Sequence, residues 1–361
     1  MKNFKTKLFA AAMAAPLAMS GVTAVFADEA TDAQKGTAAP VVKTTVSLAG
    51  DINPESLSFT YRATRSNEDG NETTFTYPAV EPKTLTYTAS AEGMTVSDVD
   101  ENNMKTLTAT TNLFDGVNYT HAGVYVWNVQ QSSTCAQNTD TIKRTLTPAP
   151  EAYTVKAYVY NRNEGTGFEV TYVVENATGK KVETTEGKHI LAFTNNYSEV
   201  RENQENGVFS LTHKVDGELA DKTRDFTYTV SFAKPSNAES EEISVEGLTA
   251  NDNGTYTYTA KHGDPAFKVT KAPVGTVVTI TPTNVPDDYT TNWEGATADS
   301  NGVVKAAITA DGTYLTVTHT KDATTSPITG NIINNLPFLG LIAVALGGFI
   351  AYIALKRRQN A

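Results

Sequence analysis

Short alternations of apolar and polar residues recur through the central part of the chain. Runs such as SLSFTYRAT, YTVKAYVY and TYLTVTHT place Leu, Phe, Tyr or Val at every second position. A period of two is typical of β-strands that bury one face, and the Gly, Asn, Asp and Pro residues between the runs indicate turns. No amphipathic helical stretch of ten or more residues stands out between residues 40 and 325. The pattern therefore predicts an all-β protein.

The strand-like runs fall into two halves with a common plan. Each half opens with an apolar strand and follows it with Phe-Thr-Tyr, at residues 59–61 and at residues 226–228. The polar stretch EVRENQENG lies between the halves. We therefore predict two tandem Ig-like β-sandwich domains, at residues 41–198 and 208–321, joined by a linker at residues 199–207.

The first residues have the three-part pattern of a secretory signal peptide. Three lysines precede the apolar run Leu8–Phe26, and Val-Phe-Ala ends at position 27. This pattern predicts a signal peptide over residues 1–27, with cleavage between Ala27 and Asp28. The alternative is an uncleaved N-terminal membrane anchor. Residues 28–40 are polar and small, and we expect them to form a disordered leader.

The other end of the chain combines a short motif with an apolar run. Phe338–Leu355 contains no charged residue and, as a helix, would span about 27 Å, enough to cross the hydrocarbon core of a membrane. Lys356, Arg357 and Arg358 follow it and would stay on the cytoplasmic side. These features predict a C-terminal transmembrane helix with the bulk of the protein outside the cell.

The segment 322–361 resembles the cell-wall sorting signal of Gram-positive bacteria, whose motif is Leu-Pro-x-Thr-Gly. Here Ser replaces Leu, and the motif consists of Ser326, Pro327, Ile328, Thr329 and Gly330. The resemblance implies that a sortase cleaves between Thr329 and Gly330 and passes the threonine acyl group to an amine. It also implies a secreted protein that is finally attached to peptidoglycan in the cell wall.

The net charge limits the expected partners, and the cysteine content limits the expected chemistry. Loss of both ends removes six basic and no acidic residues, which changes the formal charge from −11 to −17. A strongly acidic chain is not expected to bind nucleic acid or an anionic membrane. Cys135 is the single cysteine, so an intramolecular disulfide is impossible, and no His or Asn partner suggests a catalytic thiol.

The chain between its two ends resembles a Gram-positive backbone pilin of the streptococcal T-antigen type, built from pilin isopeptide-linkage domains. The segments that carry the resemblance are FDGVNYTHAGVYVWNVQQ, EVTYVVENATGKKV, EGKHILAFTNN and HKVDGELADKTRDFTYTV. The resemblance implies a structural subunit of a covalent surface pilus with a part in cell adhesion. An unpolymerised wall-anchored adhesin or a pilus base subunit is the alternative.

In this family a lysine seven residues before the Asn that ends the last strand of the first domain accepts the sortase-bound threonine of the next subunit. Asn195 ends the strand AFTN, and the residue seven positions earlier is Lys188. The resemblance therefore implies an intersubunit amide bond between Lys188 and Thr329 of a second copy. Lys180 and Lys181, in a turn just upstream, are the alternative acceptors.

The family also forms an internal isopeptide bond in each domain, from a buried Lys, an acid and an Asn. The corresponding positions hold Leu48, Gln131 and Asn195 in the first domain and His213, Pro282 and His319 in the second. Lys43 and Lys214 are the nearest lysines, but strand alternation places them on the opposite face. We therefore predict that neither domain forms this bond through the usual triad.

The remaining residues give no sign of an enzyme or of a cofactor. The five histidines are scattered, and no paired-carboxylate, Gly-x-Ser-x-Gly or metal motif accompanies them. His213 and His319 are expected to face one another on neighbouring strands. A packed neutral pair is favoured over a metal site or a pH switch, because a zinc site needs at least a third protein ligand.

Overall fold

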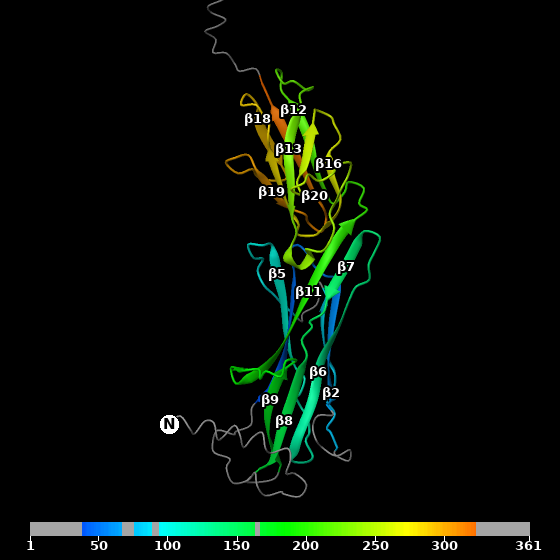
Figure 1. Ribbon diagram of the computed structural model, residues 1–361, viewed down its shortest axis with the longest axis vertical. Coiled ribbons are helices and arrows are strands. Elements are labelled where there is room, and N and C mark those ends of the chain that lie inside the picture. Colours follow the sequence, from blue (N-terminus) through cyan, green and yellow to red (C-terminus); the bar gives the residue numbers. More distant parts are fainter. Residues whose placement is uncertain (1–37, 67–75, 89–93, 163–166, 323–361) are drawn as a thin grey trace, which may run out of the picture.

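The computed structural model describes residues 38–66, 76–88, 94–162 and 167–322. Two β-rich units follow one another along the long axis (Figure 1). Apart from a single turn of 3₁₀-helix, Ser236–Ala238, every regular element in the described ranges is a strand. The prediction of an all-β fold is therefore confirmed. The apolar alternation explains it, because the Val-, Thr- and Tyr-rich runs favour the half-buried surface of a sheet.

The first unit is a sandwich of two sheets. One sheet has the strand order β3-β2-β6-β8-β9, and the facing layer contains β4, β5, β1 and β11 in adjacent positions. Its first and last long strands, β1 and β11, run parallel, with Val46 opposite Asn195. The strands are β1 (Ala38–Ala49), β2 (Ser56–Arg65), β3 (Lys83–Thr88), β4 (Thr95–Val96), β5 (Met104–Asn112), β6 (Gly123–Cys135), β7 (Ile142–Thr147), β8 (Tyr153–Asn161), β9 (Phe168–Asn176), β10 (Thr184–Thr185) and β11 (Lys188–Glu202).

The second unit repeats this plan with shorter strands. The sheet β15-β13-β17-β19 packs on the layer β18-β20-β12-β16. The first and last strands again run parallel, with Val215 opposite His319. The strands are β12 (Phe209–Asp216), β13 (Phe226–Ala233), β14 (Ser244–Val245), β15 (Tyr256–Ala260), β16 (Phe267–Pro273), β17 (Val277–Pro282), β18 (Thr290–Glu294), β19 (Val304–Ala307) and β20 (Thr313–Thr320).

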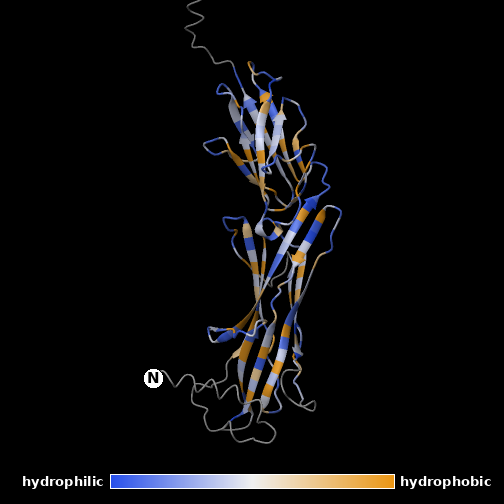
Figure 2. Cartoon of the chain, in the orientation of Figure 1, coloured by the Kyte–Doolittle hydropathy of each residue, from blue (hydrophilic) through white to orange (hydrophobic). Residues whose placement is uncertain are grey.

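Each sandwich has its own aromatic core. Figure 2 shows hydrophobic residues alternating with polar residues along β6, β8 and β9. Burying one large apolar side chain contributes about 1.5–3 kcal/mol, so these cores supply most of the favourable free energy of folding. The fully buried aromatic side chains of the first core are Phe59, Tyr61, Tyr125, Phe193 and Tyr197, and those of the second are Phe209, Phe226 and Tyr228.

One strand joins the two units. In β16, residues 271–273 pair with the end of β11, and residues 267–269 pair with the start of β12. Both pairings are antiparallel, so β11 and β12 point in the same direction. The facing layers of the two sandwiches are therefore parts of one continuous sheet.

We predicted a linker at residues 199–207, but the first four of these residues belong to the shared sheet. Residues 199–202 lie within β11, and Glu199 is only 3% exposed. The sequence looked like a linker because it is rich in charge, but these charged groups find partners inside the protein. At the N-terminal side, β1 begins at Ala38, within the segment predicted to be a disordered leader.

The second unit also contacts the end of the first through its loops. The Nδ2 atom of Asn237 donates a hydrogen bond to the carbonyl oxygen of Tyr197, at 2.7 Å. Gly275 has φ +89°, and a Cβ atom there would lie 2.6 Å from the Cβ atom of Ala49. Only glycine fits this left-handed position at such a close approach.

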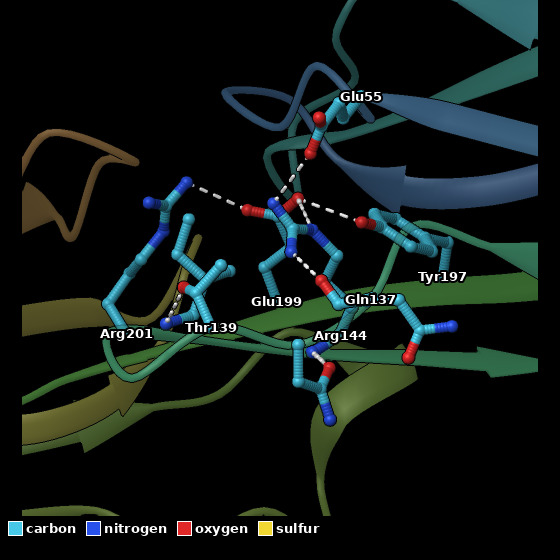
Figure 3. A network of polar contacts seen from close by, with 9 residues as sticks. Glu55, Gln137, Thr139, Arg144, Tyr197, Glu199 and Arg201 are labelled. Carbon is cyan, nitrogen blue, oxygen red and sulfur yellow. Dashed lines mark hydrogen bonds and ion pairs between the residues drawn. The ribbon is translucent and has the colours of Figure 1, made fainter.

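A buried ion-pair network stabilises the junction (Figure 3). The Glu199 carboxylate accepts hydrogen bonds from the Tyr197 hydroxyl and from Arg201 Nη2, both at 2.8 Å. Arg144 Nε, on β7, lies 3.9 Å from the same carboxylate, and Arg144 Nη2 lies 3.1 Å from the carboxylate of Glu55. The backbone of Glu199 accepts a hydrogen bond from Val274 N of the second unit, at 2.8 Å.

We predict that Glu199→Ala lowers the free energy of unfolding by about 3–5 kcal/mol, because it leaves the largely buried guanidinium group of Arg201 without its carboxylate and removes the buried one of the two carboxylates beside Arg144. Glu55→Ala is the matched control. Glu55 binds the same Arg144, but its side chain is 72% exposed, so its loss should cost less than about 1 kcal/mol. Urea denaturation measures both, and equal losses would contradict the central role of Glu199.

Candidate functional site

Lys188 lies at the tip of a tight hairpin and faces solvent. Glu186 and Gly187 have φ of 52° and 77°, and they connect Thr185 to Lys188, which are paired across the hairpin. Two consecutive residues with positive φ are typical of a two-residue β-hairpin turn. The side chain of Lys188 is exposed, while its backbone is fixed between β10 and β1, opposite Ala38. The amine is thus accessible on a well-held strand end.

His189, the next residue, points inward and ties the hairpin to the body of the first unit. It is 9% exposed. Its Nδ1 atom lies 2.9 Å from the carbonyl oxygen of Val182, and its Nε2 atom lies 3.0 Å from that of Tyr172 on β9. This anchoring role was not predicted. The signal was present, because His189 shares the strand face of Leu191 and Phe193.

The two alternative acceptors lie in a different turn. Lys180 and Lys181 are exposed and follow β9. The Asn176 side chain organises this turn by accepting hydrogen bonds from the backbone N–H groups of Thr178 and Lys180, at 3.1 and 3.0 Å. The backbone of Lys181 forms an isolated antiparallel β-bridge with the backbone of Glu175. All three lysines are exposed, so exposure alone does not identify the acceptor. Of the three, only Lys188 is the first residue of a long strand.

Several predicted segments lie outside the described residues. They are the signal peptide with its cleavage site at Ala27 and Asp28, the motif Ser326–Gly330 and the apolar run Phe338–Leu355. Among the residues that are described, no helix has the length and apolar character needed to cross a membrane.

The first unit contains a buried polar cluster that includes Gln131 and Asn195, two of the three positions matched above to the isopeptide triad. Tyr61 is its centre. Its hydroxyl group is hydrogen bonded to Thr44 Oγ1 and donates to Gln131 Oε1, at 3.0 Å. Gln131 Nε2 donates to Asn195 Oδ1 at 2.6 Å, and Ala149 N donates to the same oxygen at 2.9 Å. Burial raises the pKa of Tyr61 to about 12, so the phenol stays protonated.

The second unit has an equivalent centre at Tyr228. Tyr61 is the register partner of Gln131, and Tyr228 is the register partner of Pro282. The Tyr228 hydroxyl lies 2.7 Å from His319 Nε2. The repeated Phe-Thr-Tyr pattern thus places one buried tyrosine at the same point of each sandwich. The repeat is visible in the sequence, but the buried hydrogen-bonding role of its tyrosine is not.

The strand register relates positions in the two units to each other. Thr44 stands two residues before the register partner of Asn195, and His213 stands two residues before the register partner of His319. The residue of the first domain that matches His213 is therefore Thr44. Leu48 is fully buried in the apolar core, four residues further along β1.

His213 and His319 form the buried pair that the sequence suggested. Their ring centroids are 5.4 Å apart, and both side chains are at most 1% exposed. His319 Nδ1 lies 2.9 Å from Thr291 Oγ1, and Phe226 stacks on the ring of His319 at 4.4 Å. His213 Nδ1 lies 3.2 Å from the carbonyl oxygen of Lys261, so this nitrogen carries the proton.

The environment of this pair keeps both rings neutral. Burial, reinforced by the proximity of His213, lowers the pKa of His319 to about 4. Burial also lowers the pKa of His213. Within the described ranges no cluster of three or more His, Cys, Asp or Glu residues could hold a metal ion.

The described lysines near these centres do not point into them. Lys43 and Lys214 are exposed, as strand alternation predicts. Lys105 was not considered in the sequence. It is 7% exposed, burial lowers its pKa, and its Nζ atom donates to Asn53 Oδ1 at 3.1 Å. Asn53 itself is exposed, unlike the buried amide of Asn195.

Comparison with known proteins gives a curated relative that spans most of the chain. A pilin from Streptococcus pyogenes serotype M1 is 25% identical over 310 residues, which cover 81% of this chain and 82% of that pilin. A family model described as a domain of unknown function (DUF7601) matches residues 207–322. The resemblance to a Gram-positive pilin is therefore confirmed. A pilin is a structural subunit, and the likeness supports a protein that is not an enzyme.

Solved structures of pilins also match. The major pilin from Streptococcus pyogenes is 21% identical and aligns with 79% of this chain and 100% of its own, with a TM-score of 0.32. The major pilin T3.2 from serotype GAS13637 of the same organism is 17% identical over 78% of this chain and 98% of its own, with a TM-score of 0.30.

We predict that the intact mass of the fragment 28–329 equals its formula mass. The reason is that the centres around Tyr61 and Tyr228 contain no lysine amine. Each amide bond between Lys and Asn would release ammonia and lower the mass by about 17 Da. A deficit that disappears in Lys105→Ala would assign a bond to Lys105 and Asn53 and contradict the prediction.

We also predict that acid selectively weakens the second unit. Below pH 6.5 the unfolded chain protonates its histidines, whereas His319 in the folded protein stays neutral down to about pH 4. Its contribution to stability is therefore complete above pH 6.5 and falls by about 1.4 kcal/mol per pH unit between pH 6.5 and 4. Urea denaturation between pH 7.5 and 4.5 measures this slope.

The variant His319→Asn should reduce that slope, because asparagine does not titrate. The exposed His121, replaced by Gln, is the control and should leave the slope unchanged. Identical slopes for the original protein and His319→Asn would show that this histidine is not responsible. Carboxylates contribute equally to the pH dependence of the free energy of unfolding in the original protein and in both variants, so their effect cancels in the comparison.

Proposed function

We propose that this chain is the shaft subunit of a covalently polymerised surface pilus of a Gram-positive bacterium. The observation that carries the proposal is the presentation of Lys188, an exposed amine on a rigid hairpin, in a chain similar to a pilin along most of its length. The acidic charge and the signal peptide pattern agree with an exported surface protein.

In the proposed reaction a sortase thiolate attacks the carbonyl carbon of Thr329. The Thr329–Gly330 peptide bond breaks, the amine of Gly330 leaves, and a thioester forms. The neutral amine of Lys188 from another copy then attacks the thioester carbonyl. An amide bond forms, the thiolate is released, and the nitrogen loses a proton. The last subunit is passed to an amine of peptidoglycan, which anchors the polymer to the cell wall.

Lysine suits the acceptor role for two reasons. Its ammonium group can lose a proton in an enzyme pocket, whereas a guanidinium group stays charged. Its flexible stem can also extend into that pocket while the backbone of β11 stays in the sheet. His189 supports this arrangement, because its two contacts with backbone carbonyl oxygens fix the strand end from which Lys188 projects.

We predict that Lys188→Ala abolishes the ladder of high-mass bands in a denaturing immunoblot of cell-wall extract, leaving the monomer. Lys188→Arg should do the same, because it preserves the positive charge but not the nucleophile. Lys180→Ala and Lys181→Ala are matched controls, since both lysines are exposed and nearby, and they should leave the ladder intact.

Two other results would contradict the proposal. A single wall-linked band from the unaltered protein would leave an anchored adhesin or a base subunit. A ladder that survives Lys188→Ala but is lost with Lys180→Ala or Lys181→Ala would support a polymerised pilin. It would also show that the acceptor is one of those two lysines and not Lys188.

A further inference from the structure

In the proposed shaft each chain is held at two points, the side chain of Lys188 and the carboxyl group of Thr329. The covalent path between these points contains β11 and the whole second unit, and it leaves out every residue before Lys188. We propose that the second unit is the load-bearing and extensible element of the shaft, and that the first unit, apart from β11, is carried outside the load path. This inference rests on the proposed function.

The first step is the behaviour of β11 under tension. One neighbour pulls on its first residue, Lys188, and the rest of the shaft pulls on its last residue, Glu202. A β-strand is already close to full extension at about 3.3 Å per residue, so β11 can transmit the force with little change in length. Because the two pulls oppose each other along one strand, they produce little net shear between β11 and its neighbours β1 and β7.

The second step is the transfer of force into the second unit. β11 and β12 point in the same direction, and β16 pairs with both. The connection between them is short and tightly packed. Gly207 has φ +70°, and a Cβ atom there would lie 2.5 Å from the carbonyl oxygen of Val269. The load therefore passes from the end of β11 to the start of β12, which pair with neighbouring parts of the same strand, β16.

The third step is the geometry of β12 and β20. These strands are parallel neighbours in continuous register, from Phe209 opposite Thr313 to Asp216 opposite Thr320. Force enters at the start of β12 and leaves at the end of β20, which are opposite ends of the pair. All the hydrogen bonds between the two strands are then loaded together in shear rather than opened one by one. This arrangement gives the second unit a high resistance to unfolding.

Further hydrogen bonds lock both ends of this strand pair. At the start, Thr313 N donates to the carbonyl oxygen of Val208, at 3.1 Å. At the end, Lys321 N donates to the carbonyl oxygen of Asp216, at 3.0 Å. The side-chain contacts between β20 and the opposite sheet, such as His319 with Tyr228, are also non-covalent.

Because these described contacts between β12 and β20 are non-covalent, the pair can separate at high force. Residues 209–320 would then extend to about 390 Å at about 3.5 Å per residue, compared with about 26 Å for a folded eight-residue strand. Unfolding of the second unit should therefore lengthen one subunit by about 360 Å.

Single-molecule force spectroscopy tests the proposal. Handles are attached to the cysteine of Lys188→Cys and to the C-terminus of the fragment 28–329, in a Cys135→Ser background. We expect one unfolding step of about 360 Å in contour length. Pulling instead from the cysteine of Ala38→Cys, in the same background, places both units in the path, and we expect two steps.

Two core variants provide a matched control. Phe59 in β2 and Phe226 in β13 are the first residues of the repeated Phe-Thr-Tyr pattern, and both are fully buried. With handles at position 188, Phe226→Leu should lower the unfolding force, and Phe59→Leu should leave it unchanged. With handles at position 38, each variant should weaken the step of its own unit, which shows that both variants fold.

Two results would overturn the inference. A second step from the first unit with handles at position 188 would show that this unit bears load. The absence of any step before the tether breaks would show that a covalent cross-link holds the second unit. The force measurement uses a single chain and does not require polymerisation. A ladder without the single unfolding step would contradict the inference about load and leave the proposed function standing. The single step without a ladder would contradict the proposed function.

Discussion

The antiparallel pairing of β16 with both β11 and β12 is the constraint on which the rest of this structure depends. It makes two sandwiches share one sheet, and it fixes their order along a common axis. A flexible connection between the units would allow any relative orientation. The contact of Gly275 with Ala49, and the hydrogen bond from Val274 N to the backbone oxygen of Glu199, cross between the two units at the place where this pairing brings their ends together.

Within each sandwich, a buried tyrosine hydroxyl organises the polar groups that link the two sheets. In the first unit the Tyr61 centre consists of Thr44, Gln131 and Asn195, and nearly every polar atom finds a partner. In the second unit His319 takes the corresponding place. Buried polar groups are tolerated when they are hydrogen bonded, and they favour one register over a shifted one. These centres supply specificity through hydrogen bonds.

The fold was largely predictable, and the site only in part. The period-two pattern and the Phe-Thr-Tyr repeat, at residues 59–61 and 226–228, are local signals that a single sequence displays. Pairing between distant strands is not local, which is why the extension of β11 past Glu199 was missed. Lys188 could be located because its spacing to Asn195 lies within one strand, whereas the role of His189 depends on carbonyl groups of other segments.

The proposed load path connects the chemistry of the second unit with its mechanics. His213 lies on β12 and His319 on β20, the two strands that would be sheared. A positive charge on either ring would have to be accommodated in an apolar site that contains Phe226, at a cost that weakens this strand pair first. Neutral histidines are compatible with this apolar site near neutral pH. On the proposed load path, such a unit would extend under high force while the first unit stays folded beside the shaft.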